Sequence, residues 1–505
     1  MKITILVALG LVTTFLYSCG DTTKSKAESK KQLSKPNIIY ILADDMGYAD
    51  IGCYGNEKIE TPNIDNLAKN GMMFTQHYSG DAVCAPSRCV LLTGKHSGHS
   101  DVRNNNPWAS RGNVWSMEAM MKDSTLEGQP PMRESTVTIA SVLKSAGYKT
   151  GMSGKWGLGA PNTSSTPTQK GFDFFIGYNC QRVAHTYYPP FLYKNDRRLY
   201  LDNKVIPLSE KLPANADKYD EKSYARYTQK EYSPDIMYRE IENFVTKNRD
   251  TTFFFYWATP IPHVALQAPK RWVDYYVKKF GDEVPYSGGK GYYPTRYPHA
   301  TYAAMISYLD ENIGKLITKL KELGIYDNTL IIFTSDNGPT FNGGTDSQWF
   351  NSAGKLGSQP KEIKGSLDDG GIRIPMIAQW PGKIKPGVVS EHVSAFWDIF
   401  PTFCNLTGIK TPEGLDGISM LPTLLNSGEQ EKHEYLYWEL GRNQAIRWGD
   451  WKAIRRLKGQ DKKIRLFNLK TDIKERTNVA EQNPDIVKQM EEIFSKVRTE
   501  PVKYY

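Results

Sequence analysis

Residues 37–45 read NIIYILADD, an apolar run that ends abruptly in two aspartates. Residues 252–258 (TFFFYWA) and 329–335 (TLIIFTS) repeat this pattern, and the second of them runs directly into the sequence DNG. Unbroken apolar runs of this length are typical of strands that are buried on both faces of a parallel sheet. The sequence therefore predicts a parallel sheet whose strands end in polar side chains.

Helical patterns separate these runs. Residues 61–74, 135–146 and 302–323 place apolar side chains at helical spacing, and Gly71 and Gly324 are expected to close the first and the last of these helices. A shorter apolar run at 148–153 leads into Lys155. Strands that alternate with helices indicate a doubly wound α/β fold, in which ligands bind at the carboxyl ends of the strands. The polar residues that follow the strands are therefore expected to converge at one edge of the sheet.

The pattern changes after about residue 431. A helical segment at 484–497 follows a series of short apolar segments that are separated by turns. These segments are 435–439, 444–447, 451–455 and 464–468. Such a series predicts a small antiparallel sheet with one helix. We therefore divide the chain into a main body at 36–430 and a C-terminal subdomain at 431–505.

The N-terminal residues resemble an export signal. Met1 and Lys2 precede an apolar stretch at 3–17 that is too short to span a membrane comfortably. The sequence LYSC at 16–19 looks like a bacterial lipobox, and ordinary cleavage without lipidation is the alternative. We expect a signal peptide at 1–18, a lipid on Cys19 and a flexible tether at 19–35. On this prediction the protein is exported and is a periplasmic or outer-membrane lipoprotein.

Residues 84–88, CAPSR, place a thiol, a proline, a hydroxyl and a guanidinium at the expected start of a helix. Pro86 fits the first turn without losing a hydrogen bond, and the N–H groups of that turn favour anions. Arg88 lies one turn along the helix, on the same side as Cys84. A buried structural cysteine is the ordinary alternative. The pattern predicts a nucleophile beside a group that holds an anion.

Hard oxygen donors stand at the ends of two predicted strands: Asp44, Asp45, Asp336 and Asn337. No histidine or cysteine accompanies them in sequence, so this donor set suits Ca²⁺ or Mg²⁺ rather than Zn²⁺. A divalent cation would also relieve the repulsion between three carboxylates. Single residues of this kind usually cap helices or form turns. Two such pairs at strand ends favour a metal site.

The CAPSR run, followed by LTG at 92–94, resembles the signature of type I sulfatases, in which this cysteine is oxidised to formylglycine (3-oxoalanine). Residues 36–50 and 335–339 are similar to two further motifs of that family, and motifs match in order from about residue 36 to 480. The resemblance implies an alkaline-phosphatase-like α/β fold, with a large, mostly parallel sheet flanked by helices. It also implies a separate sulfatase-maturing enzyme, and Ca²⁺ held near Cys84 by Asp44, Asp45, Asp336 and Asn337.

The resemblance further implies a sulfuric ester hydrolase that works through a formylglycine hydrate. One hydroxyl of the hydrate attacks sulfur and the second later expels sulfate, so no stable sulfated enzyme remains. Arg88, Lys155 and Lys364 would neutralise the sulfate charge. His263 is the expected general acid for the leaving alcohol. Candidate contacts to the sugar or the sulfate are His185, His96, His99, Arg103 and Asn104.

Two positions depart from the family pattern. Gly157 stands where many sulfatases have a histidine, and Asp369 stands where glutamate is common. A hydrogen bond to the formylglycine is therefore expected to be missing or to come from another residue. Neither change removes a metal ligand or the nucleophile.

The motifs are most similar to those of bacterial carbohydrate sulfatases, relatives of arylsulfatase A and N-acetylgalactosamine-6-sulfatase. An exported protein with an aromatic loop at 187–193 suits a sulfated glycan, such as a glycosaminoglycan or marine polysaccharide fragment. We expect a sugar of the galactose or N-acetylgalactosamine type. Two alternatives stay open. One is a phosphonate monoester hydrolase or phosphodiesterase of the same superfamily, and the other is a non-catalytic glycan-binding lipoprotein.

The composition gives no indication of a nucleic-acid partner, and the cysteine count does not decide between disulfides and free thiols. The 505 residues carry a net charge of +9, and no block of lysine and arginine with interleaved aromatic residues indicates nucleic-acid binding. Besides Cys19 and Cys84, the chain has Cys53, Cys89, Cys180 and Cys404. Four cysteines allow three pairings, and free thiols fit their spacing equally well.

Overall fold

The computed structural model describes residues 35–289, 291–457 and 463–502. The predicted signal peptide, Cys19 and the tether up to residue 34 lie outside this range. Among the described residues, no helix combines the length and the apolar character needed to cross a membrane.

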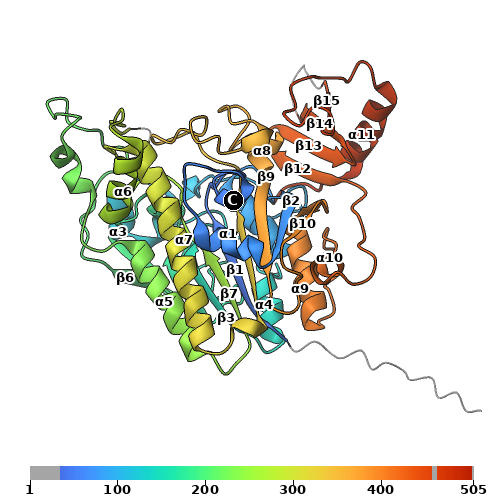
Figure 1. The fold of residues 1–505 in the computed structure, drawn as a ribbon, viewed down its shortest axis with the longest axis horizontal. Coiled ribbons are helices and arrows are strands. Elements are labelled where there is room, and N and C mark those ends of the chain that lie inside the picture. Colours follow the sequence, from blue (N-terminus) through green and yellow to red (C-terminus); the bar gives the residue numbers. More distant parts are fainter. Residues whose placement is uncertain (1–34, 290, 458–462, 503–505) are drawn as a thin grey trace, which may run out of the picture. The chain divides into compact units, whose positions relative to one another are not determined.

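A large sheet forms the centre of the fold (Figure 1). Its strands are β1 (Asn37–Ala43), β2 (Met72–Tyr78), β3 (Lys149–Lys155), β4 (Phe174–Tyr178), β5 (Phe191–Lys194), β6 (Arg197–Tyr200), β7 (Phe253–Ala258), β8 (Thr329–Ser335), β9 (Arg373–Gln379), β10 (Val388–Ser390) and β11 (Ser394–Ala395). The order in this 11-stranded sheet is β10-β2-β9-β8-β1-β7-β3-β4-β5-β6, with β11 paired to β2.

The centre of the sheet is parallel, as predicted. Strands β8, β1, β7, β3 and β4 run in one direction. Strand β9 is antiparallel to both β8 and β2, and β5 and β6 continue antiparallel beyond β4. The sheet as a whole is therefore mixed, with a block of parallel strands in the middle and parallel pairing of β10 and β11 with β2 at one edge.

Helices cover both faces of the sheet. One layer contains α1 (Pro62–Lys69), α5 (Ser233–Lys247), α6 (Lys270–Phe280) and α7 (Pro298–Glu322), and the other contains α2 (Cys84–Thr93), α4 (Ile139–Ser145) and α9 (Ile399–Thr407). Alternate residues of β1 show the two layers. Ile39 and Ile41 belong to the same apolar core as α5 and α7, whereas the Tyr40 ring lies 6.3 Å from that of Phe403 on α9. This alternation buries both faces of the strand.

Shorter helices lie in the connections: α3 (Met117–Lys122), α8 (Asp369–Ile372) and α10 (Leu421–Leu425). The predicted helices at 61–74, 135–146 and 302–323 correspond to α1, α4 and α7. Helix α1 ends at Lys69, two residues before Gly71, the glycine expected to close it. Residues 72–74 belong to β2, which pairs with β9.

The register of the central strands determines where the site forms. Ala43 at the end of β1 pairs with Ser335 at the end of β8, and Leu42 pairs with Ala258 at the end of β7. The three strands therefore end at the same level of the sheet. Beyond them, the backbone N–H of Asp336 donates to the carbonyl of Ala43 at 3.0 Å.

A second, four-stranded sheet follows in sequence, with β12 (Leu436–Leu440), β13 (Asn443–Trp448), β14 (Trp451–Arg456) and β15 (Arg465–Asn468) paired in that order and antiparallel. Helix α11 (Pro484–Lys496) packs Met490 and Phe494 into the same apolar cluster as Leu466. Figure 1 shows this sheet and helix together in orange and red. The small antiparallel sheet with one helix is confirmed, and the boundary near residue 431 stays a prediction.

Each described cysteine carries a free thiol. This holds for Cys53, Cys84, Cys89, Cys180 and Cys404. Of the two possibilities that the spacing left open, free thiols are the one observed in the described part of the chain.

Candidate active site

Three aspartates lie together where β1 and β8 end, and each has a fully buried side chain. Oδ1 of Asp336 accepts a hydrogen bond from the backbone N–H of Asp45 at 3.0 Å. Asn337 Nδ2 donates to Oδ1 of Asp45 at 2.8 Å. Asp44 follows β1 directly, and its N–H donates to the carbonyl of Ile261 at 3.0 Å. Carboxylates this close and this dry repel one another, so the group needs compensating cations.

Cys84 contacts two of these carboxylates. Its Sγ lies 3.3 Å from Oδ1 of Asp44 and 3.8 Å from Oδ1 of Asp45. Burial, together with the charge of Asp44, raises the pKa of the Cys84 thiol. Because the thiolate is the reactive form of cysteine, the unmodified side chain is a weak nucleophile at neutral pH. The structure thus brings the predicted nucleophile to the predicted metal ligands.

The first turn of α2 is fixed to the end of β8 by Ser87. Its Oγ donates to the carbonyl of Asp336 at 2.5 Å and accepts from the N–H of Gly80 at 3.0 Å. The helix begins after Val83, which is extended, and ends at Gly94, whose φ of 67° is left-handed. A glycine in this conformation closes a helix at little steric cost. The serine of the CAPSR motif therefore holds the helix start in place.

Arg88 balances the charge of the carboxylates from one turn further along α2. Its Nε and Nη2 donate to Oδ2 of Asp336 at 3.0 and 2.9 Å, and Nη2 lies 3.3 Å from Oδ2 of Asp44. Nη1 donates to the carbonyl of Lys155 at 2.8 Å. The guanidinium is buried, and its Nε, Nη1 and Nη2 atoms donate hydrogen bonds to protein groups. Arg88 therefore joins the ends of β1, β3 and β8.

Two lysines complete the ring of cations. Nζ of Lys155, at the end of β3, lies 2.7 Å from Oδ2 of Asp44. Nζ of Lys364 lies 2.6 Å from Oδ2 of Asp45. The loop that carries Lys364 is anchored next to α2, because the N–H of Gly365 donates to the carbonyl of Ala82 at 2.9 Å. Both lysines that the sequence selected are therefore at the site.

The carboxylates differ in their affinity for protons. Burial and the neighbouring charge of Asp44 outweigh Arg88 and raise the pKa of Asp336 to about 6. Burial alone would also raise the pKa of Asp44, but Lys155 and Arg88 lower it below its usual range. The three carboxylates are matched in number by Arg88, Lys155 and Lys364, so the formal charges of the site balance.

The residues present fit a hard divalent cation. Oδ1 of Asn337 is buried and has no hydrogen-bond partner among the described residues. Ligand atoms from Asp44, Asp45, Cys84 and His263 lie within 4.8 Å of one another. That group has two carboxylates, a thiol and an imidazole. The Asp336 carboxylate and the Asn337 amide, both hydrogen-bonded to Asp45, add the oxygen donors that Ca²⁺ and Mg²⁺ prefer. An amide oxygen that ligates such an ion would have no hydrogen-bond partner in the protein, as is found for Oδ1 of Asn337 in the part of the chain that is described.

His263 borders the cluster in a fixed orientation. Its Nδ1 donates to the carbonyl of Val264 at 2.5 Å, so Nε2 faces the carboxylates, 3.6 Å from Oδ2 of Asp45. Burial and the charges of Lys364 and Lys155 hold the pKa of His263 well below its usual value. His185 stacks on it with ring centres 5.2 Å apart. Both histidines selected from the sequence are therefore at the site.

The other four predicted substrate contacts interact with residues outside the Cys84 cluster, and their role in substrate binding stays a prediction. His99 Nδ1 lies 2.9 Å from Oδ1 of Asp416, and the His96 ring packs 5.2 Å from that of Tyr437. Arg103 pairs with Glu439 of β12 at 2.9 Å. Exposed Asn104 accepts a hydrogen bond from the N–H of Asn106 at 2.8 Å. The structure does not bring His96, His99, Arg103 or Asn104 to the Cys84 cluster through any contact among the described residues.

Sequence reasoning missed two residues near the start of α2, of which Asn105 contacts the helix and Gln181 contacts Asn105. Asn105 Oδ1 accepts from the N–H of Ala85 at 2.7 Å and from Nε2 of Gln181 at 3.4 Å. A Cβ at Gly157 would lie 2.6 Å from Cγ of Gln181. The Gln181 amide thus occupies the space beside Gly157, where many sulfatases have a histidine. The unusual glycine was the one signal in the sequence that could have led to Gln181.

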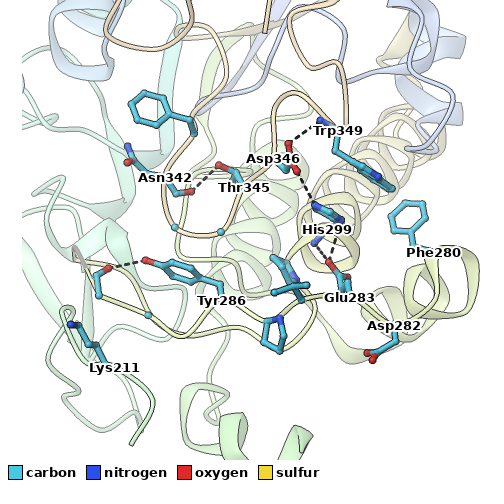
Figure 2. Close-up of a pocket in the computed structure, with 18 residues that line it drawn as sticks. Lys211, Phe280, Asp282, Glu283, Tyr286, His299, Asn342, Thr345, Asp346 and Trp349 are labelled. Atoms are coloured by element: carbon cyan, nitrogen blue, oxygen red, sulfur yellow. Dashed lines mark hydrogen bonds and ion pairs between the residues drawn. The ribbon is translucent and has the colours of Figure 1, made fainter. Parts of the chain in front are cut away.

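A separate cavity of about 970 Å³ opens beside the loop that follows Asn337 (Figure 2). Figure 2 shows His299 between Glu283 and Asp346, whose carboxylates lie 3.4 Å from its two ring nitrogens. The charged side chains on its wall are Lys211, Asp282, Glu283 and Asp346. None of the sequence-predicted site residues lines it. Three carboxylates against one lysine on this wall disfavour a sulfate group in this cavity.

Comparisons with known proteins agree with this geometry. Residues 36–409 match the family model described as Sulfatase, and residues 364–500 match the model described as N-sulphoglucosamine sulphohydrolase, C-terminal. The chain is 30% identical to an N-acetylgalactosamine-6-O-sulfatase of Bacteroides thetaiotaomicron, over 95% of this chain and 96% of the relative. It is 32% identical to human arylsulfatase A, over 83% and 74% of the two chains.

A solved structure shows the same fold. The crystal structure of Ps i-CgsB in complex with k-i-k-neocarrahexaose matches with a TM-score of 0.71 and 29% identity, over 93% of this chain and 95% of that one. The family model covers most of the chain, and the bacterial relative matches along nearly its whole length. This chain therefore belongs to the sulfatase family and is a sulfuric ester hydrolase.

Proposed function

We propose that this chain hydrolyses sulfate esters of carbohydrates, using a formylglycine made from Cys84 and a bound Ca²⁺. The observation that carries the proposal is the meeting of the Cys84 side chain with buried carboxylates, with Sγ 3.3 Å from Asp44. A sulfated sugar is supported by the similar N-acetylgalactosamine-6-O-sulfatase and by the similar structure that binds a neocarrahexaose. A separate maturing enzyme would oxidise Cys84.

Asp44, Asp45, Asp336 and Asn337 would hold the cation, and the orphaned Oδ1 of Asn337 is its clearest mark. When bound, Ca²⁺ would polarise the oxygens of a sulfate group. The preference for Ca²⁺ over Mg²⁺ rests on the family resemblance. Lys155 and Lys364 now neutralise Asp44 and Asp45, and once those carboxylates ligate a cation their ammonium groups can donate to sulfate oxygens instead.

A formylglycine hydrate at position 84 would supply one hydroxyl for attack on sulfur and a second whose deprotonation releases sulfate. Arg88 keeps its contacts with Asp336, Asp44 and the Lys155 carbonyl and so preserves the geometry around position 84. The burial of these groups excludes water and strengthens each electrostatic contact.

His263 would give a proton to the leaving alcohol. Its Nδ1 is committed to the Val264 carbonyl, so Nε2 is the atom that faces the reaction. Burial, together with the charges of Lys364 and Lys155, lowers the pKa of this imidazole in the protein alone. A sulfate ester next to it adds negative charge, which favours the imidazolium, and Nε2 can then hold a proton for transfer. His185, stacked on His263, would contact the sugar or the sulfate.

A desulfation screen tests the proposal. Protein co-produced with a sulfatase-maturing enzyme is assayed on defined sulfated mono- and disaccharides, with Cys84→Ala as the inactive control. We expect turnover of at least one sulfated saccharide, which the control loses. Faster turnover of aryl phosphate diesters than of aryl sulfates would favour a phosphodiesterase. Unmodified Cys84 in the native host, with no turnover of any sulfated glycan, would favour a non-catalytic glycan-binding protein.

We also propose that the chain is exported and lipidated at Cys19, as a periplasmic or outer-membrane lipoprotein. The support is the LYSC sequence at 16–19, which follows a short apolar stretch. Growth with a clickable fatty acid should label the wild-type protein. The label should disappear in Cys19→Ser. Equal labelling of both proteins, or of neither, would contradict the proposal.

A further inference from the structure

Arg182 is a partly buried cation without a carboxylate partner. Its side chain makes no ion pair with any described residue, and its Nε is buried without a hydrogen-bond partner there. Burial also lowers the pKa of this guanidinium, which shows how poorly its charge is solvated. By contrast, Arg88, Lys155 and Lys364 each pair with an aspartate of the site. A desolvated, unpaired guanidinium is costly, so a ligand that compensates it is expected.

A tryptophan holds this guanidinium in position. The Cζ atom of Arg182 lies 4.4 Å from the ring centre of Trp115, and the Trp115 side chain is nevertheless 57% exposed. Stacking on the ring uses the face of the guanidinium and leaves its edge, where the N–H groups lie, free to donate. An exposed aromatic ring beside a fixed set of donors is suited to a sugar that carries an anionic group.

The loop that carries Trp115 also holds a second pair of an arginine and a tryptophan. Arg111 lies 4.6 Å from the ring centre of Trp108, its Nη1 is buried without a hydrogen-bond partner, and it has no ion pair within the described ranges. Arg271 shows the ordinary arrangement: it lies 5.9 Å from the Trp272 ring and pairs with Glu311 at 2.8 Å. Tryptophan contact alone therefore does not leave an arginine unpaired.

Arg182 lies next to the candidate active site. The preceding residue, Gln181, hydrogen-bonds to Asn105, which accepts the N–H of Ala85 beside Cys84. The carbonyl of Arg182 accepts from the N–H of His185 at 3.2 Å. The ring of His185 in turn stacks on that of His263. A group bound by Arg182 would therefore belong to the same substrate molecule as the sulfate at Cys84, but to a neighbouring part of it.

We propose that Arg182, held on Trp115, binds a second anionic group of the substrate, a sulfate or a carboxylate on the sugar next to the one that is desulfated. The parallel N–H donors of a guanidinium match two oxygens of either anion. This inference rests on the proposed sulfatase function and narrows its substrates to saccharides that carry more than one negative charge.

Three disaccharides test the proposal, each with the same cleavable sulfate. The neighbouring sugar is neutral in the first, sulfated in the second and a uronic acid in the third. The quantity measured is kcat/KM for the second or the third substrate divided by kcat/KM for the first. In Arg182→Gln we expect this ratio to fall about tenfold, because one charge-assisted contact is lost. Arg182→Lys should lose part of the ratio, because it keeps the charge without the paired donors. The substrate whose ratio falls identifies the anion.

Controls separate this inference from the proposed function. Arg271→Gln should leave all three values of kcat/KM unchanged, and melting curves should show that every variant is folded. An unchanged ratio in Arg182→Gln, or an equal loss on all substrates, would overturn the inference. If the wild type turns over none of the substrates, the proposed function fails. Titration calorimetry can then still test whether Arg182 binds an anionic group. In the Cys84→Ala background, Arg182→Gln should weaken binding of a doubly charged saccharide about tenfold, and equal binding would contradict the role of Arg182.

Discussion

Sγ of Cys84 lies 3.3 Å from Oδ1 of Asp44, although the two residues are 40 positions apart and belong to different elements. Asp44 is placed by the register of β1 between β7 and β8, and Cys84 by the first turn of α2. The contact therefore depends on both the sheet and the helix that covers it. Changes to either side of it should alter stability, the reaction, or both.

Arg88→Ala should reduce the free energy of unfolding by about 3–5 kcal/mol, because it leaves Asp44 and Asp336 buried without their shared partner. Denaturant titration of the metal-free protein measures this loss. Arg271→Ala, which breaks a half-exposed ion pair with Glu311, should cost no more than about 1 kcal/mol. Equal losses in the two variants would contradict the role given to Arg88.

His263→Asn should slow hydrolysis of sugar sulfates much more than hydrolysis of 4-nitrophenyl sulfate. A sugar alkoxide needs a proton as it leaves, whereas nitrophenolate does not, and general acid catalysis contributes about 10²–10⁴-fold. Comparison of kcat for both substrates in the wild type and the variant gives the answer. A uniform loss on both substrates would assign His263 to structure or to sulfate binding instead.

Gly157→Ala should destabilise the protein by about 1–3 kcal/mol, since Gly157 has a φ of 71° and its new Cβ would lie 2.6 Å from Cγ of Gln181. Thermal melting measures the effect. Adding Gln181→Ala removes the overlap and leaves the backbone strain, so the double variant should recover part of the loss. A double variant no more stable than the sum of the two single changes would show that these residues do not compete for space.

The pKa of Glu475, a residue outside the carboxylate cluster, predicts that the free energy of unfolding depends on pH. Burial raises its pKa to about 8, against about 4.3 in an unfolded chain, although Lys452 Nζ lies 2.8 Å from its Oε1. The folded state then binds the proton more tightly. The resulting stabilisation is complete below the unfolded pKa and is lost as the pH rises through about 8.

Glu475→Gln removes this titration. Between pH 5 and 8, the free energy of unfolding of the wild type should fall relative to that of the variant, by at most about 1.4 kcal/mol per pH unit. Urea titrations at several pH values measure the difference. Parallel pH profiles for the two proteins would show that the carboxyl is already ionised in the folded state.

The central strands could be predicted because their apolar runs are unbroken. Residues 37–43 and 329–335 are strands at the predicted bounds, and the polar residues after them do converge. The direction of β9 could not be predicted, because an apolar run does not reveal whether its partner is parallel. The helix expected to close at Gly71 ends at Lys69, and the strand that begins at Met72 could not be predicted, because its pairing with β9 leaves no mark in the sequence.

Motifs in the sequence predicted the residues of the Cys84 cluster, but they did not predict the residues that surround it. His96 and His99 follow Cys84 closely in sequence, yet α2 has 10 residues and carries them about 15 Å along its axis, towards Asp416. Gln181 and Arg182 lie far from Cys84 in sequence and belong to no recognisable motif. Only the packing against Asn105 and Trp115 places them beside the site.

The most direct test of the account is a crystal structure of the protein co-produced with a sulfatase-maturing enzyme and grown in calcium chloride, with anomalous data to locate the ion. We predict one ion bound to oxygens of Asp44, Asp45, Asp336 and Asn337 at about 2.3–2.6 Å, with an oxidised side chain at position 84 beside it. No ion at this place, with Lys155 and Lys364 still paired to the aspartates, would contradict the central claim.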